Sequence, residues 1–284
     1  MMSNQNIDLI AAYFTISGDV YPFGPTEISP FSFKDRVEAA AEAGYKGLGL
    51  VHPDLMATVD RYGYKEIRHI LDANGIKHFE VEFLTDWYKT GEKLRLSHKM
   101  RDEMFEVASE VGLHAIKVAP GVGEDTADIP LMAEKFAELA DGAKANNTSL
   151  MLEIMPFSNV RTIDTALGIV QGADRDNAGL MLDIWHLARG NVDFSEISKV
   201  PVKFIKGIEL DDADKYAVEP LWMDTISRRR LPGEGILDIN RFITEVKKTG
   251  YEGPWGVEIL SEAFRKLPLE QMAKESFDKT IRFF

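Results

Sequence analysis

The chain has 284 residues, of which 45% are hydrophobic and 28% charged, as is ordinary for a globular protein with a sizeable core. It has no cysteine, which excludes disulfides, thiolate nucleophiles and zinc–thiolate clusters, so any metal site must use oxygen or imidazole ligands. The formal net charge of -13 argues against a nucleic acid as partner, because phosphate binding requires a basic surface.

The sequence also argues against a membrane protein. No apolar run approaches the roughly 18 residues needed to span a bilayer. Residues Met1 to Ile10 lack the basic start and the apolar centre of a secretory signal. We therefore expect no membrane partner and a cytoplasmic location.

Short β-rich runs alternate with amphipathic helical stretches along the whole chain, which is the pattern of βα units around a parallel sheet. The predicted strands are Leu9 to Ile16, Gly47 to Val51, His78 to Leu84, Ala115 to Ala119, Ser149 to Met155, Gly179 to Trp185, Phe204 to Leu210 and Trp255 to Leu260. The predicted helices include Ser32 to Ala43, Tyr64 to Asn74, Leu94 to Val111, Ile129 to Ala145, Ile163 to Gly172 and Ile239 to Lys248.

Eight such units predict a single-domain (β/α)8 TIM barrel that spans residues 1–284, because each unit then averages about 35 residues. An open doubly wound sheet alternates in the same way. However, it usually has a glycine-rich phosphate turn after its first strand, and none follows Ile16. The longest connection, Asp211 to Asp238, joins the last two strands and is expected to form a lid or a binding element.

In four of the predicted strands an apolar run ends in an acidic residue, namely Glu153, Asp183, Glu209 and Glu258. Burying unpaired carboxylates is costly, and the C-terminal ends of barrel strands surround one pocket. We therefore predict that the four acids bind one divalent metal ion, with Mn2+ favoured over Mg2+ or Co2+. The alternative is that each acid pairs with a nearby Lys or Arg, as Glu209 can with Lys206.

Three further polar residues are candidates for binding a substrate. His186 follows Asp183 by three residues and can hydrogen-bond a hydroxyl or move a proton. His52 ends the second strand. Arg229, in the long connection, can present its guanidinium to a hydroxyl, carboxylate or phosphate. The competing interpretations are a capping or packing role for each His and a solvated loop for Arg228, Arg229 and Arg230.

Aromatic residues at or just past strand ends can supply an apolar wall against a sugar face, although core packing is the more frequent role of an aromatic residue. They are Trp185, Phe157, Trp87 and Phe14. On the third strand, Glu80 and Glu82 alternate with apolar residues and so share one face, either the pocket or the helix layer.

With these motifs in place, nearly the whole chain resembles the xylose isomerase-like TIM barrel superfamily. This superfamily contains sugar isomerases, ketose 3-epimerases, inosose and dehydroshikimate dehydratases, and endonuclease-IV-type repair enzymes. The resemblance rests on Leu152-Glu153, Leu182-Asp183-Ile184-Trp185-His186, Gly207-Ile208-Glu209-Leu210-Asp211, Arg229-Arg230-Leu231-Pro232-Gly233-Glu234-Gly235 and Gly256-Val257-Glu258.

The resemblance implies roles for these residues. Glu153 and Glu258 correspond to metal ligands that also act as an acid/base pair on opposite faces of the substrate. Asp183 corresponds to a second ligand, and His186 and Arg229 to groups that hold substrate oxygens. Two positions depart from the pattern: Glu209 stands where a His is common, and Asn159 replaces a substrate-facing Glu. The scarcity of strand-end histidines disfavours the His-rich zinc site of the repair enzymes.

These features favour a metal-dependent isomerase or epimerase that acts on a sugar, keto-sugar or related polyol through an enediolate. Either Glu153 or Glu258 removes the proton and the other returns it. The second hypothesis is a lyase of the same superfamily, of the inosose or dehydroshikimate dehydratase type or the 3-keto-glycoside deglycosidase type. The third is a non-catalytic sugar-binding or partner subunit. The expected partner is a small carbohydrate, and homo-oligomerisation stays open.

Overall fold

Eight parallel strands close into a barrel in the computed structural model, which describes residues 7–284. Around the ring their order is β1-β10-β7-β6-β5-β4-β3-β2. The strands are β1 (Leu9–Ala11), β2 (Gly47–Val51), β3 (His78–Leu84), β4 (Ala115–Val118), β5 (Ser149–Glu153), β6 (Ala178–Asp183), β7 (Ile205–Leu210) and β10 (Trp255–Val257). The predicted TIM barrel is confirmed.

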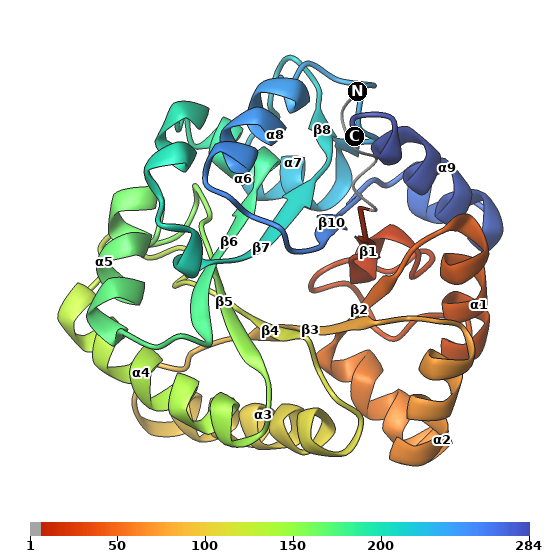
Figure 1. Cartoon of the computed structure of the whole chain (residues 1–284), viewed down its shortest axis with the longest axis horizontal. Helices are drawn as coiled ribbons and strands as arrows, with labels where there is room; N and C mark the ends of the chain where they lie inside the picture. The colour runs from red at the N-terminus through yellow and green to blue at the C-terminus, as the bar shows by residue number, and fades with distance from the viewer. Residues whose placement is uncertain (1–6) are drawn as a thin grey trace.

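Helices form an outer layer around the strands (Figure 1). They are α1 (Phe33–Ala43), α2 (His52–Ala73), α3 (Gly91–Glu110), α4 (Ile129–Ala145), α5 (Ile163–Ala173), α6 (Ile184–Arg189), α7 (Leu221–Ser227), α8 (Ile239–Lys248) and α9 (Leu269–Ile281). None of the helices in residues 7–284 combines the length and the apolar content needed to cross a bilayer.

The predicted element boundaries differ from the structure at several ends. β1 stops at Ala11, because the chain turns into a short 3-10 helix (Tyr13–Thr15). Thr15 Oγ1 there donates to the carbonyl of Val257, 2.6 Å away, and accepts from the backbone N–H of Ile259. The same contacts end β10 before the predicted Leu260. Helix α2 begins twelve residues before the predicted Tyr64, with a break at Gly63.

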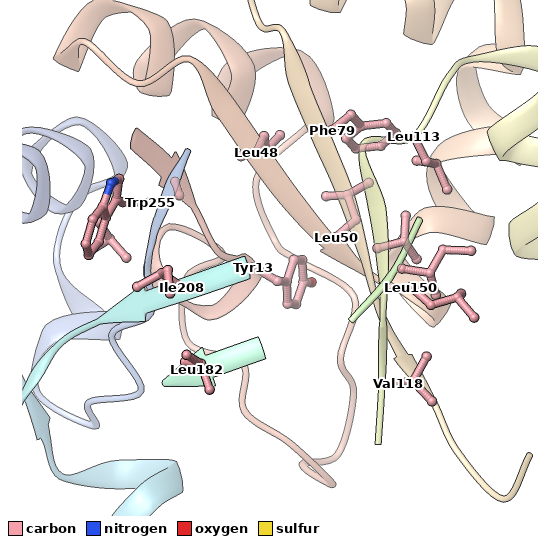
Figure 2. Packing of buried hydrophobic residues seen from close by; sticks show 14 of the residues in the cluster. Tyr13, Leu48, Leu50, Phe79, Leu113, Val118, Leu150, Leu182, Ile208 and Trp255 are labelled. Carbon is pink, nitrogen blue, oxygen red and sulfur yellow. The ribbon is translucent and has the colours of Figure 1, made fainter. Parts of the chain in front are cut away.

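The two faces of each strand bury different side chains. Leu150, Leu182 and Ile208 belong to the large apolar core that packs between the barrel and the helices (Figure 2). The alternate residues point into the barrel, where Ala115, Met151 and Met181 form a small separate apolar cluster. Two residues further along the same strands, this inner face carries Lys117, Glu153 and Asp183. We call Lys117, Glu153, Asp183 and the charged residues at the same level the charged layer. It lies next to the apolar cluster along the barrel axis, toward the C-terminal ends of the strands.

The long connection after β7 folds back on itself. Residues Asp212–Ala213 (β8) pair antiparallel with Arg229–Arg230 (β9), and α7 lies between them. The carboxylate of Asp212 accepts backbone N–H groups of Gly233, Gly235 and Leu237. A Cβ at Gly235 would lie 2.3 Å from the carbonyl oxygen of Ala213, so this tight turn requires glycine. The connection is thus tied to the barrel rim.

Candidate metal centre and active site

The barrel register brings the four predicted ligands together. Asp183 and Glu209 are direct partners on β6 and β7, and Glu209 pairs with Gly256 of β10. One oxygen atom from each of Glu153, Asp183, Glu209 and Glu258 lies within 4.8 Å of the others, and all four residues are buried. A Cβ at Gly256 would lie 2.7 Å from Cγ of Glu209, so the glycine leaves room for that carboxylate.

Asp183 also begins the short helix α6. Its Oδ1 accepts the backbone N–H of His186 at 3.0 Å, which is an N-cap interaction. One helical turn then places His186 Nε2 3.1 Å from Glu153 Oε1. The same nitrogen lies 3.1 Å from Arg229 Nη2. A single imidazole nitrogen therefore lies between an acid and a guanidinium, and the tautomer decides whether it donates to the first or accepts from the second.

The structure buries Trp185, which was expected to contribute to an apolar wall against the substrate. Because β6 ends at Asp183 and not at Trp185, Trp185 belongs to α6 and is turned into the protein, where it is fully buried. Its ring packs under the guanidinium of Arg229, 5.2 Å from the ring centre, and against His186. Trp185 therefore supports two site residues from behind.

Lys117 of β4 is the main cation in the charged layer. Its Nζ contacts Glu209 Oε1 and lies 3.2 Å from Glu82 Oε2 and 3.4 Å from Glu258 Oε1. Although burial opposes its charged form, Glu209, Glu82 and Glu258 raise the pKa of Lys117 well above its usual value. The proposed pairing of Glu209 with Lys206 is wrong, because three residues apart on one strand they lie on opposite faces.

Arg229 is the second buried cation. Its Nη1 lies 2.6 Å from Asp183 Oδ2, 2.5 Å from Asp211 Oδ2 and 3.0 Å from Glu258 Oε2. Burial raises the pKa of Asp183, but Arg229 and His186 together hold it below its usual range. The flanking Arg228 and Arg230 are exposed and both pair with Asp214. The three arginines therefore alternate between solvent and site.

The cluster contains more carboxylates than cations. Lys117, Arg229 and the imidazole of His186 contact six acids: Glu82, Glu153, Asp183, Glu209, Asp211 and Glu258. Burial raises the pKa of Glu153, and burial together with Glu258 raises the pKa of Glu209 well above its usual value. The protein must therefore either hold protons on these acids or bind a further cation.

The residues present fit a divalent metal ion. Glu153 Oε2 and Glu209 Oε2 are buried and have no hydrogen-bond partner among the described residues. Both belong to the group of four carboxylates described above. Carboxylate oxygens are the donors that Mn2+ and Mg2+ prefer. Pairing with Lys and Arg, the alternative to a metal site, therefore accounts for only some of the carboxylate oxygens in the cluster.

A cavity of about 270 Å³ opens above the charged layer. Glu82, Glu153, His186, Arg229 and Glu258 line its deep end. Asp183 and Glu209 are buried without lining it. The structure thus brings Glu153, Glu258, His186 and Arg229 to one cavity, as a substrate site requires, while their roles stay predictions.

The remaining predicted residues lie around this cavity or behind it. His52 lines the cavity, and its Nε2 is 2.8 Å from Glu103 of α3. Phe14 and Phe157 also line it, whereas Trp87 is buried and donates its indole N–H to the carbonyl of Ala119. Asn159 hydrogen-bonds Gly121 and Tyr88 in the neighbouring loop and does not line the cavity.

The sequence interpretation missed Lys117 and left the direction of Glu82 open. Both point into the barrel, and Glu82 lines the cavity. A signal existed for Lys117, since a lysine inside the apolar run Ala115 to Val118 is as costly to bury as the strand-end acids. Asp211 was noted only as part of a motif, and the structure shows that it pairs with Arg229.

Comparison with known proteins identifies the family. Residues 37–283 match the family model described as xylose isomerase-like TIM barrel. The chain belongs to this family. The resemblance inferred from the strand-end motifs is therefore confirmed over most of the chain.

Curated relatives of this xylose isomerase-like protein are enzymes. The 3-dehydroshikimate dehydratase of Pseudomonas aeruginosa is 26% identical over 238 residues, 82% of this chain. The chain spans only 37% of that dehydratase's length. An inosose isomerase of Halalkalibacterium halodurans is 25% identical over 225 residues, which cover 76% of this chain and 78% of the isomerase.

Solved structures show the same fold at lower identity. The IolI protein with a bound zinc atom superimposes with a TM-score of 0.85 at 20% identity, covering 98% of both chains. D-psicose 3-epimerase from Clostridium cellulolyticum H10, solved with D-tagatose, gives a TM-score of 0.74 at 14% identity over 98% of this chain and 99% of the epimerase. Both matches show that the barrel fold is shared.

Proposed function

We propose that this protein is a divalent-metal-dependent isomerase or epimerase that moves a proton next to the carbonyl of a sugar, keto-sugar or related polyol. The observation that carries the proposal is the buried convergence of Glu153, Asp183, Glu209 and Glu258 at the deep end of a cavity, with unpartnered oxygens on Glu153 and Glu209. The match to a curated relative named inosose isomerase supports it.

The four carboxylates would hold the metal, with Mn2+ favoured because the donors are oxygens. A bound divalent ion would supply a Lewis acid that stabilises negative charge developing on substrate oxygens. Lys117 and Arg229 offset part of the charge of the ligands, which leaves the site anionic enough to bind a cation but not to repel the substrate.

Glu153 and Glu258 are placed to transfer protons. Glu153 ends β5 and Glu258 follows β10, so β6 and β7 separate them around the ring and they face the cavity from different sides. Burial raises the pKa of Glu153, which brings it closer to the value suited to proton transfer near neutral pH. One carboxylate removes a proton next to the carbonyl and the other returns one.

His186 and Arg229 orient the substrate. Both line the cavity beside Glu153 and Glu258. The N-cap at Asp183 fixes His186, and the carboxylate of Asp211 fixes Arg229. Arg229 donates to substrate oxygens at the face where Glu258 acts, and His186 reaches those near Glu153. Their fixed positions favour one orientation of the substrate.

A lyase is the second candidate, favoured by the similarity to 3-dehydroshikimate dehydratases over 82% of this chain. The same proton abstraction leads to elimination when a leaving group lies β to the carbanion. His186, next to Glu153, is then the group that protonates the departing oxygen.

The two reactions are distinguished by incubating the protein and Mn2+ with ketoses, inososes and 3-dehydroshikimate in D2O. Deuterium next to the carbonyl without loss of a group supports an isomerase or epimerase, and loss of water supports a lyase. Purified protein without any divalent ion, whose stability also does not respond to a chelator, would contradict both and favour a non-catalytic carbohydrate-binding subunit.

A further inference from the structure

A continuous line of aromatic rings connects the charged layer to the protein surface. The ring of Phe157 lies 5.6 Å from that of His186, and Trp222 of α7 lies 5.6 Å from Phe157 at an interplanar angle of 89°. Phe23 continues the line, 5.3 Å from Trp222. Phe157, Trp222 and Phe23 all line the cavity. We call these three rings the aromatic track.

The cavity is divided into a polar and an apolar part. Glu82, Glu153, Arg229 and Glu258 carry the charge of the deep end, while the carboxylate of Glu27, which also lines the cavity, accepts the backbone N–H of Phe23. Apolar side chains, among them Pro22, Val122 and Ile226, line the cavity together with the aromatic track. A small polyol carries hydroxyls on almost every carbon, and a hydroxyl against such a wall loses its water partner without gaining another. The outer part of the cavity is therefore poorly suited to a small polyol alone.

Phe23 shows that the outer end of the track is built and not accidental. Its side chain is 81% exposed, although it is large and apolar. Its backbone has a φ of 59°, a region that residues other than glycine rarely adopt. The backbone N–H donates to Glu27 Oε1 at 2.7 Å, which stabilises this conformation. The protein thus maintains an exposed ring at the cavity mouth, where it is available to a ligand.

We propose that the substrate is amphipathic, with a keto-polyol head at the carboxylates and an attached planar apolar group, about the size of an aromatic ring, along the aromatic track. The head rests on the function proposed above, whereas the tail rests on the track itself. Stacking and edge contacts with Phe157, Trp222 and Phe23 bind the planar group. The long connection therefore contributes to specificity through Trp222 as well as through Arg229.

Binding of matched ligands tests the tail. The probes are methyl and phenyl 3-keto-β-D-glucopyranoside, which share one head, and phenol, which has none. With Mn2+ present, calorimetry should show that the phenyl glycoside binds about tenfold or more tightly than the methyl glycoside, as expected for burying a ring. Phenol should bind weakly and compete with the phenyl glycoside only.

Substitutions locate the effect. Phe23→Ser and Trp222→Ala, both outside the barrel core, should remove the advantage of the phenyl glycoside and leave the affinity for the methyl glycoside unchanged. Tyr216→Ala is the matched control, because Tyr216 is 74% exposed in the same connection but does not line the cavity. It should change neither affinity.

Equal affinities for the two glycosides, or a phenyl advantage that survives both substitutions, would overturn the proposal. So would a change of oligomeric state in Phe23→Ser without any change in phenol binding, since the ring would then belong to a protein interface. Failure of the proposed function gives a different result: neither glycoside exchanges deuterium with D2O, while phenol still binds in a Trp222-dependent manner.

Discussion

Lys117 and Glu209, 92 residues apart in the sequence, form a buried ion pair inside the barrel. Both side chains are at most 2% exposed. Glu209 occupies the third position of the carboxylate set, where the family resemblance implies a neutral histidine. The lysine places a positive charge directly against this additional carboxylate. Lys117 therefore leaves about as many carboxylates without a neighbouring cation as there would be if a histidine stood at position 209.

Removing one partner of this pair should be more damaging than removing both. Lys117→Met leaves Glu209 buried without its cation and should lower the free energy of unfolding of the metal-free protein by about 3–5 kcal/mol. Lys117→Met combined with Glu209→Gln should recover most of this loss. Denaturant unfolding of the single and double variants measures the coupling. Lys206→Met, on the opposite face of β7, is the control, and additive losses would show that the pair is not coupled.

Replacing the proposed acid/base residue should abolish turnover without unfolding the protein. Glu258→Gln keeps the size of the side chain and can still accept from Arg229 and Lys117, but it cannot take a proton. We expect the rate at saturating Mn2+ to fall by about 10²–10⁴-fold. Glu262→Gln, four residues further on with an exposed side chain, should retain full activity. Unchanged turnover of Glu258→Gln would remove Glu258 from the proton-transfer pair.

The metal ligands can be separated from the residues that only support them. Asp183 and Asp211 accept from the same Nη1 of Arg229, but only Asp183 belongs to the four-carboxylate set. Asp183→Asn should therefore lower the affinity for Mn2+ by more than about tenfold relative to Asp211→Asn, measured by calorimetry. Equal losses in the two variants would mean that Asp183 acts through Arg229 and not as a ligand.

Glu82 should make the stability of the metal-free protein depend on pH. Burial, together with Glu258 and Glu153 and against the effect of Lys117, raises its pKa from 4.5 to about 7. Between these values the folded protein holds a proton that the unfolded chain has released. The free energy of unfolding therefore falls as pH rises through this window.

Glu82→Gln mimics the protonated side chain and removes this dependence. Relative to the original chain, the variant should gain about 1–3 kcal/mol of unfolding free energy at pH 8 compared with pH 5. Chemical denaturation at both pH values, with a chelator present, measures the difference. Glu134→Gln, on the exposed face of α4, should shift both values equally. No gain for Glu82→Gln would show that Lys117 keeps Glu82 ionised throughout.

Much of the fold was predictable because its signals are local. The alternation of apolar strands and amphipathic helices located all eight barrel strands. The acids at the ends of the apolar runs correctly predicted that Glu153, Asp183, Glu209 and Glu258 lie close together. The ends of β1 and β10 were not predictable, because Thr15 ends them by bonding Val257 and Ile259 more than 240 residues away.

The failures at the site have two physical causes. Trp185 was assigned to the wrong face because the N-cap at Asp183 ends β6 two residues early, and side chains on a strand and on a helix point in different directions. Lys117 was missed because a lysine in a strand cannot be assigned to the site until its partners are known, and these are Glu82 on β3, Glu209 on β7 and Glu258 just after β10. A local cap decided the first outcome, and contacts between distant strands decided the second.

Of the three consecutive arginines 228–230, only Arg229 lies in the site, and the antiparallel pairing of β8 with β9 determines which one it is. In this register Ala213 pairs with Arg229, and the two residues that flank Arg229, Arg228 and Arg230, face the solvent. A single-codon insertion between Pro220 and Arg228 can be absorbed by the loop if the pairing is kept. If the register slips by one residue instead, the guanidinium leaves the barrel although every arginine is still encoded. An insertion in this segment would therefore be tolerated if the β8–β9 register is kept and inactivating if the register slips. The two kinds of variant could not be distinguished by aligning the arginines alone.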